Sequence, residues 1–138
     1  MIGRAKTFLI LGAAFAALAV AIGAFGAHGL RERLAPEAIA LYQTGVQYHF
    51  WHALGLLAVG LVCRQTGAAG AWLAAAGWLL AAGIVLFSGS LYALALGAPR
   101  ATGMVTPLGG IAFIGGWVAL AVGVGRAGRG EENRPSMD

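Results

Sequence analysis

The stretch TFLILGAAFAALAVAIGAFGAHGL, residues 7–30, carries no charged side chain between Lys6 and Arg31. A helix needs about 20 mainly apolar residues to cross a bilayer, because it rises about 1.5 Å per residue through about 30 Å of hydrocarbon. Further charge-free stretches cover residues 38–63, 65–99 and 101–125. Each is long enough to span, so the sequence predicts four transmembrane helices.

The composition of the 138-residue chain supports this prediction. Hydrophobic residues make up 59% and charged residues only 10%, whereas soluble domains carry about 25% charged residues. A disordered chain would have the opposite bias. We therefore predict an all-α, polytopic membrane protein: an antiparallel bundle within residues 1–125, with helices at about 5–27, 36–63, 71–96 and 107–125. The polar tail, 126–138, is predicted to be disordered.

Signals at the helix ends fit these boundaries. Pro36 suits the first turn of the second helix, and Gly97 with Pro99 ends the third. Thr106 is the expected N-cap of the fourth helix, with Pro107 in its first turn.

The positions of the Lys and Arg residues indicate how the chain is oriented in the membrane. The net charge is +4, but Lys and Arg lie between and outside the apolar runs and do not form a patch. We therefore expect membrane lipid, and no nucleic acid, as a partner. If both termini share one side, that side carries Arg4, Lys6, Arg64, Arg126, Arg129 and Arg134, and the opposite side carries Arg31, Arg33 and Arg100. The positive-inside rule then predicts a multi-pass inner-membrane protein with both termini in the cytoplasm.

Small residues recur at helical spacing, which favours close helix packing in lipid. We expect packing roles for the glycines Gly12, Gly23, Gly89, Gly109, Gly116 and Gly123. The preferred interpretation is packing within one bundle. The alternative is a seam for a homo-oligomer or for another membrane protein.

Polar residues in the second and third spans are the candidate site. At 100° per residue, Tyr42, His49 and His52 share one face of the second helix, and Gln43 and Gln47 share another. Ionisable groups inside a membrane normally face a bundle interior, so this helix is predicted to be central. The complete predicted cluster is His28, Tyr42, Gln43, Gln47, Tyr48, His49, His52, Ser88, Ser90, Tyr92 and Thr106.

Two interpretations of this cluster remain open. The favoured one is hydrogen bonding between helices, in which antiparallel packing sets Ser88 level with Gln47 and Tyr92 level with Gln43. The other is an outward-facing polar cavity that holds water or the head of a lipophilic ligand.

Metal, cofactor and catalytic sites are not predicted. Helix rise separates His28 from His49 and His52 by about 15–20 Å, too far for three histidines to share a zinc ion. The pair His49 and His52 lacks a third ligand in the other spans. No acidic residue occurs between Ala38 and Gly130, so a Ser-His-Asp set is excluded.

Four motifs carry a family resemblance: GAFGAHGL (23–30), TGVQYHFWHAL (44–54), LFSGSLYAL (86–94) and TPLGG (106–110). In this order they resemble the YgdD/YwdK-like family of small membrane proteins, which occurs in bacteria and has mitochondrial relatives. The resemblance implies four spans and no established activity. Family members often have Gln where this chain has His49, so the resemblance assigns any shared role to His28 and His52.

Three functions follow as hypotheses. The first is a non-enzymatic assembly, accessory or small lipophilic-ligand-binding module, because the polar cluster lacks a nucleophile–base pair. The second is a small-solute or proton transporter, because ionisable residues lie at mid-membrane depth. The third is a redox subunit that binds haem or quinone.

Overall fold

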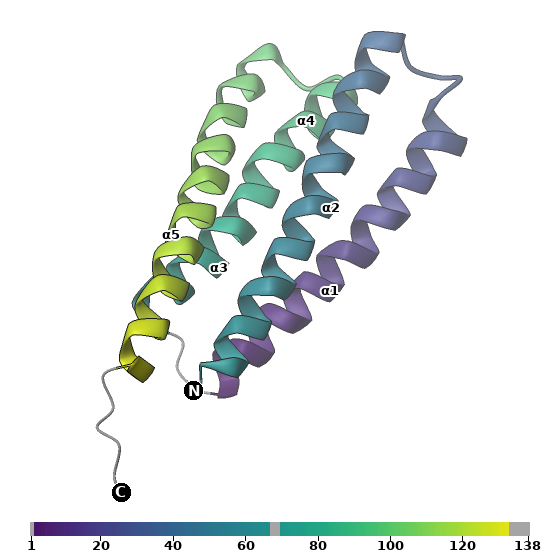
Figure 1. The fold of residues 1–138 in the computed structure, drawn as a ribbon. Helices are drawn as coiled ribbons and strands as arrows, with labels where there is room; N and C mark the ends of the chain where they lie inside the picture. The colour runs from purple at the N-terminus through teal and green to yellow at the C-terminus, as the bar shows by residue number, and fades with distance from the viewer. Residues whose placement is uncertain (1, 67–69, 133–138) are drawn as a thin grey trace, which may run out of the picture.

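The computed structural model describes residues 2–66 and 70–132, which fold into antiparallel helices (Figure 1). The elements in chain order are α1 (Ile2–Phe25), the π-helical turn η1 (Gly26–Leu30), α2 (Pro36–Gln65), α3 (Ala71–Gly83), the π-helical turn η2 (Ile84–Ser88), α4 (Gly89–Ala95), the 3₁₀ turn η3 (Arg100–Met104) and α5 (Thr106–Glu132). Within these residues, four helical segments are long and apolar enough to cross a membrane: Gly3–Leu30, Pro36–Gln65, Ala71–Ala95 and Arg100–Ala127. The predicted all-α membrane fold is confirmed.

The helices pack as two pairs joined by a central seam. α1 lies along α2, and α3 lies along α5, while α2 packs on α3, η2 and α4. Figure 1 shows α1 and α5 at opposite edges of the molecule. The predicted central position of the second span is therefore confirmed.

A glycine cap ends α4 at Gly97, whereas α5 ends later than predicted. Gly97 adopts φ +97°, and the amides of Gly97 and Ala98 donate to the carbonyls of Leu94 (3.1 Å) and Ala93 (2.9 Å). These two hydrogen bonds form a Schellman motif. The residue that follows the helix in this motif has a left-handed φ, which favours glycine. At the other end of the chain, α5 continues to Glu132. The prediction of disorder is thus wrong for residues 126–132, and residues 133–138 lie outside the described part.

Glycines let the paired helices approach closely. A Cβ atom on Gly109 would lie 2.4 Å from the backbone nitrogen of Phe87. Cβ atoms on Gly116 and Gly123 would lie 2.8 and 2.6 Å from the side chains of Leu80 and Leu73. The α5 stripe is therefore covered by η2 and α3 of the same chain.

Glycines also bring α1 close to α2. One predicted packing glycine, Gly89 of α4, behaves differently. A Cβ atom on Gly12 would lie 2.9 Å from Leu57, and one on Gly23 would lie 3.2 Å from Val46. Gly89 has no atom within 4 Å of such a Cβ, so its predicted packing role is wrong.

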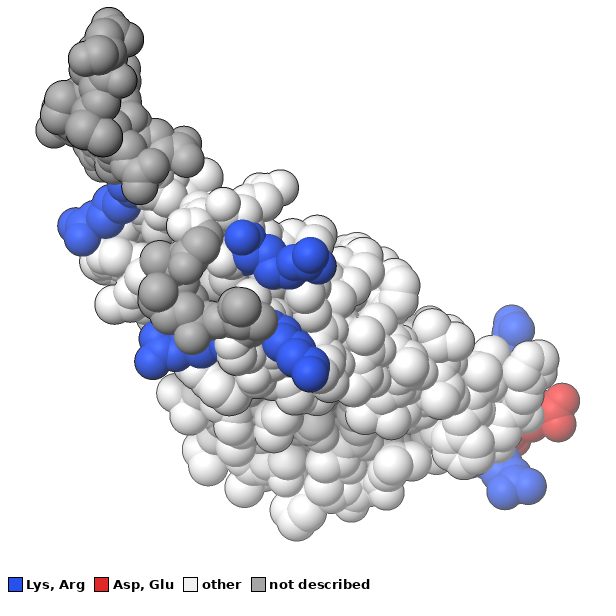
Figure 2. Space-filling model, turned by 90° about the horizontal axis from the view of Figure 1, so that it is seen from below, with Lys and Arg blue, Asp and Glu red and all other residues white. Residues whose placement is uncertain are grey.

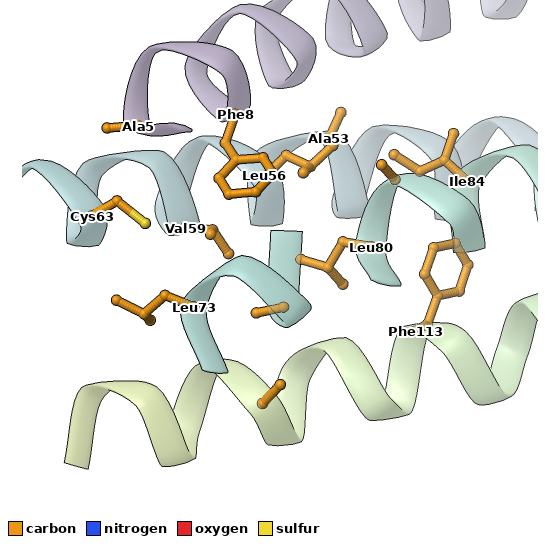
Figure 3. Packing of buried hydrophobic residues seen from close by; sticks show 13 residues of the cluster. Ala5, Phe8, Ala53, Leu56, Val59, Cys63, Leu73, Leu80, Ile84 and Phe113 are labelled. Atoms are coloured by element: carbon orange, nitrogen blue, oxygen red, sulfur yellow. The ribbon is translucent and has the colours of Figure 1, made fainter. Parts of the chain in front are cut away.

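Below the polar residues, the spans enclose an apolar core (Figure 3). Phe8 of α1, Leu56 of α2 and Leu80 of α3 are fully buried there. Phe113 of α5 closes the end of this core that lies nearest the candidate site.

Candidate functional site

The buried face of α2 positions the site. Tyr42, His49 and His52 are all buried, together with Gly45 and Leu56. These are the residues that helical spacing predicts on one face. The face points toward α1 on one side and toward η2, α4 and α5 on the other, as the contacts below show.

A chain of polar contacts links α1, α2 and α4. The Tyr42 hydroxyl donates to the carbonyl of Ile22 on α1 at 2.7 Å. Its ring packs against the ring of Tyr92 on α4, with centroids 5.2 Å apart. The Tyr92 hydroxyl in turn lies 3.0 Å from Nδ1 of His49. Three spans are thus joined through side chains of the predicted cluster.

His49 has one polar partner and one aromatic neighbour. Its Nδ1 pairs with the Tyr92 hydroxyl, and its ring makes an edge-on contact with the Phe15 ring, with centroids 5.6 Å apart. Its Nε2 is buried and has no hydrogen-bond partner within the described part of the chain. The His49 ring is therefore fixed between α1 and α4 by one hydrogen bond and one ring contact.

The contacts of His52 define its tautomer. Its Nδ1 lies 2.6 Å from the carbonyl oxygen of Tyr48, one turn earlier in α2, and must donate to it. The ring stacks on Phe113 with centroids 3.4 Å apart and planes inclined by 11°. The Tyr48 ring is also nearly parallel to it, at 5.8 Å. His52 is therefore held by its backbone and by two aromatic rings.

Hydroxyl groups join α4 to α5. Ser90 Oγ donates to the Phe87 carbonyl at 2.9 Å and lies 2.7 Å from the Thr106 hydroxyl, which therefore donates to it. Ser88, in the π-helical turn η2, is fully buried, and its hydroxyl has no partner among the described residues. The pair Ser90–Thr106 ties the start of α5 to the rest of the cluster.

Three predicted members lie elsewhere. His28, Gln43 and Gln47 are exposed, so their predicted inclusion in an interior cluster is wrong. His28 lies in η1 near the end of the first span, and both glutamines lie on the face of α2 that points away from its neighbours. Helical spacing already separates the glutamines from the histidines, which explains the difference.

Aromatic residues missing from the predicted cluster complete it. Phe87 packs against Tyr48 with centroids 4.6 Å apart, and Phe113 covers His52. Phe113 follows Gly109 by four residues and precedes Gly116 by three, so it lies on the small-residue stripe. That spacing is the signal that could have identified it.

The cluster supplies hydrogen bonds and stacking surfaces between helices. Among the described residues, no group of three or more His, Cys, Asp or Glu side chains is arranged to hold a metal ion. Both interior histidines are oriented by protein groups, and each uses Nδ1 in a contact with another residue. The arrangement can hold four helical segments in one register.

Comparisons with known proteins show that the chain is similar to a family of membrane proteins. A family model described as "Protein of unknown function (DUF423)" matches residues 22–110. The chain is 50% identical over 117 residues to the UPF0382 membrane protein YwdK of Bacillus subtilis, an alignment that covers 85% of this chain and 94% of the relative. It is 39% identical over 124 residues to the UPF0382 inner membrane protein YgdD of Escherichia coli, covering 90% and 93%. No solved structure matches the chain.

Proposed function

Since the chain belongs to the DUF423 family of membrane proteins, whose function is unknown, we propose its role from its interior: a non-enzymatic accessory or assembly module of the inner membrane. In this role the polar cluster fixes the geometry of the bundle. The outer surfaces of the bundle, held in this geometry, then carry out the accessory or assembly role.

The observation that carries this proposal is the use of the interior polar atoms. Tyr42, Tyr92 and His49 join α1, α2 and α4, and Ser90 with Thr106 joins α4 to α5. Lipid is as apolar as the helices, so such bonds, worth about 0.6 kcal/mol each, help to select one packing arrangement. A structural cluster of this kind explains buried histidines without requiring a substrate.

A flux assay separates this role from transport. We expect proteoliposomes that contain the protein to conduct protons and small solutes no faster than protein-free liposomes. The variants His49→Ala and His52→Ala should leave this background unchanged, while each loses about 1 kcal/mol of stability through its ring contacts. A reconstituted transporter of known rate serves as the positive control. Flux above background that disappears in His52→Ala would contradict the proposal.

We also propose that both termini lie in the cytoplasm. Antiparallel packing brings the start of α1 and the end of α5 to one end of the bundle (Figure 1). Figure 2 shows several Lys and Arg side chains gathered at that end, whereas the opposite end carries basic and acidic side chains together. Arg126 lies over the Trp72 ring, 5.2 Å from its centroid, as suits a pair at the membrane–water interface. The positive-inside rule then favours this orientation.

Reporter fusions test the orientation. Green fluorescent protein fused to the C-terminus should fluoresce in Escherichia coli, and alkaline phosphatase at the same position should be inactive. Both fusions placed in the α1–α2 connection, residues 31–35, should give the reverse result. Active phosphatase at the C-terminus would show that the orientation is inverted.

A further inference from the structure

The face of α2 that points away from the bundle differs from the other exposed faces. It carries Gln43 and Gln47, both exposed, beside Phe50, Trp51 and Leu54, which are 37%, 49% and 45% exposed. We call these five residues the amide face.

The two glutamines lie at the depth of the hydrocarbon. α2 spans Pro36–Gln65, so its centre falls between Phe50 and Trp51. At about 1.5 Å per residue, Gln47 lies about 5 Å and Gln43 about 11 Å from that centre. Both distances are shorter than the half-thickness of the hydrocarbon, about 15 Å. A carboxamide exposed at this depth meets acyl chains, which offer it no hydrogen bond.

Neighbouring polar groups do not satisfy these amides. Thr44, on the same side of α2, donates its hydroxyl to the Ala40 carbonyl at 3.0 Å. The Gln43 and Gln47 side chains make no such bond within the described part of the chain. By contrast, the exposed residues Ile10 of α1 and Ile114 of α5 are apolar and suit lipid directly.

The amide face also has the spacing of a helix–helix seam. Ala40, Gln47, Leu54 and Leu61 are exposed and recur every seven residues. Gln43 and Phe50 lie three residues after Ala40 and Gln47. These are the a and d positions of a heptad, at which a central polar residue fixes register and partner number.

We propose that the amide face binds the same face of a second copy of this chain, in a dimer whose two-fold axis runs along the membrane normal. This inference rests on the proposed assembly role and names its partner. All copies insert with one orientation, so such an axis places Gln47 at the same depth as the partner's Gln47. A carboxamide both donates and accepts, so two identical amides are complementary. A different partner would need its own polar group at that depth.

Cross-linking in native membranes tests the contact. In a Cys63→Ala background, Leu54→Cys is expected to give a disulfide-linked homodimer after mild oxidation. Ile114→Cys, on the exposed apolar face of α5, is the matched control and should remain monomeric. Equal cross-linking at both positions, or none at Leu54→Cys, would overturn the proposal.

The amide itself is tested with Gln47→Leu. Two bonds across the axis predict about tenfold weaker dimerisation in lipid vesicles, measured by energy transfer between labelled copies as the protein is diluted with lipid. Because the Gln47 side chain is exposed and makes no hydrogen bond within the described part of its own chain, the melting temperature of the monomer in detergent should not fall. Unchanged dimerisation would overturn the proposal. Cross-linking of Leu54→Cys to a different protein, with the purified chain monomeric, would also overturn it while leaving the assembly role intact, whereas histidine-dependent flux would remove that role itself.

Discussion

Phe113→Ala is expected to lower the free energy of unfolding by about 3 kcal/mol. The ring is 3% exposed and stacks on His52 with centroids 3.4 Å apart, and it also fills the space beside Gly83. Phe→Ala in a soluble core costs about 3–5 kcal/mol. We expect the lower end, because lipid replaces water around the separated helices and the cost of the cavity remains.

The neighbouring residue provides the control. Ile114 is 68% exposed, so Ile114→Ala removes a similar apolar side chain from the lipid-facing side of the same helix and should cost little. Unfolding in mixed micelles, followed by circular dichroism as dodecyl sulfate is added, measures both variants. Similar losses in the two variants would show that Phe113 has no special place in the site.

Gly109→Ala is expected to cost about 2 kcal/mol, although it adds only one methyl group. The new Cβ would lie 2.4 Å from the Phe87 nitrogen and 2.7 Å from the Phe87 Cα. These are backbone atoms, so α5 and η2 would have to separate, and overpacking of this kind costs about 1–3 kcal/mol. The separation should also weaken the contact between Ser90 and Thr106, since Thr106 precedes Gly109 by less than one turn.

Gly89→Ala makes the same chemical change where space is available. No atom lies within 4 Å of the position that its Cβ would take, so the variant should be neutral or slightly stabilised by the higher helix propensity of alanine. Thermal melting of both variants in one detergent compares them directly. A Gly109→Ala protein as stable as Gly89→Ala would contradict the close approach of α5 to η2.

The fold follows from sequence because the membrane sets a simple requirement. A charge-free run such as residues 7–30 must be helical to satisfy its backbone in lipid, and its length then defines a span. The buried face of α2 follows from helical spacing, which places His49 and His52 together. The signals at helix ends predict a boundary correctly where the cap depends on nearby residues alone, as at Gly97. The end of α5 differs from its predicted position because polar residues after Arg126 can continue a helix once it has left the membrane.

The candidate site was predicted less completely, for physical reasons. The sequence predicts Gln43 and Gln47 in the interior because polar groups in a span normally avoid lipid. The buried face of α2 is, however, already filled by Tyr42, Gly45 and His49. The π-helical turn η2 adds a residue to one turn of the third span, which shifts the faces of the residues after it.

The missing aromatic residues show a different limit. Phe87 and Phe113 are common in any apolar span, and nothing in their type marks them as neighbours of a histidine. Only the packing of η2 and α5 on α2 brings them beside Tyr48 and His52. Such pairings depend on tertiary register, which a single sequence does not define.

The division of the molecule into two antiparallel pairs has a consequence for biogenesis. Each pair is a helical hairpin with its own interlocking glycines, so each can enter the bilayer and close before the other arrives. Some contacts of the polar cluster lie within the first hairpin, such as Tyr42 with Ile22, whereas the pair His49–Tyr92 and the stack of His52 on Phe113 form only when the two hairpins meet. Closure of each hairpin therefore relies on packing of small residues, and the contacts between the hairpins then favour one alignment of the two halves.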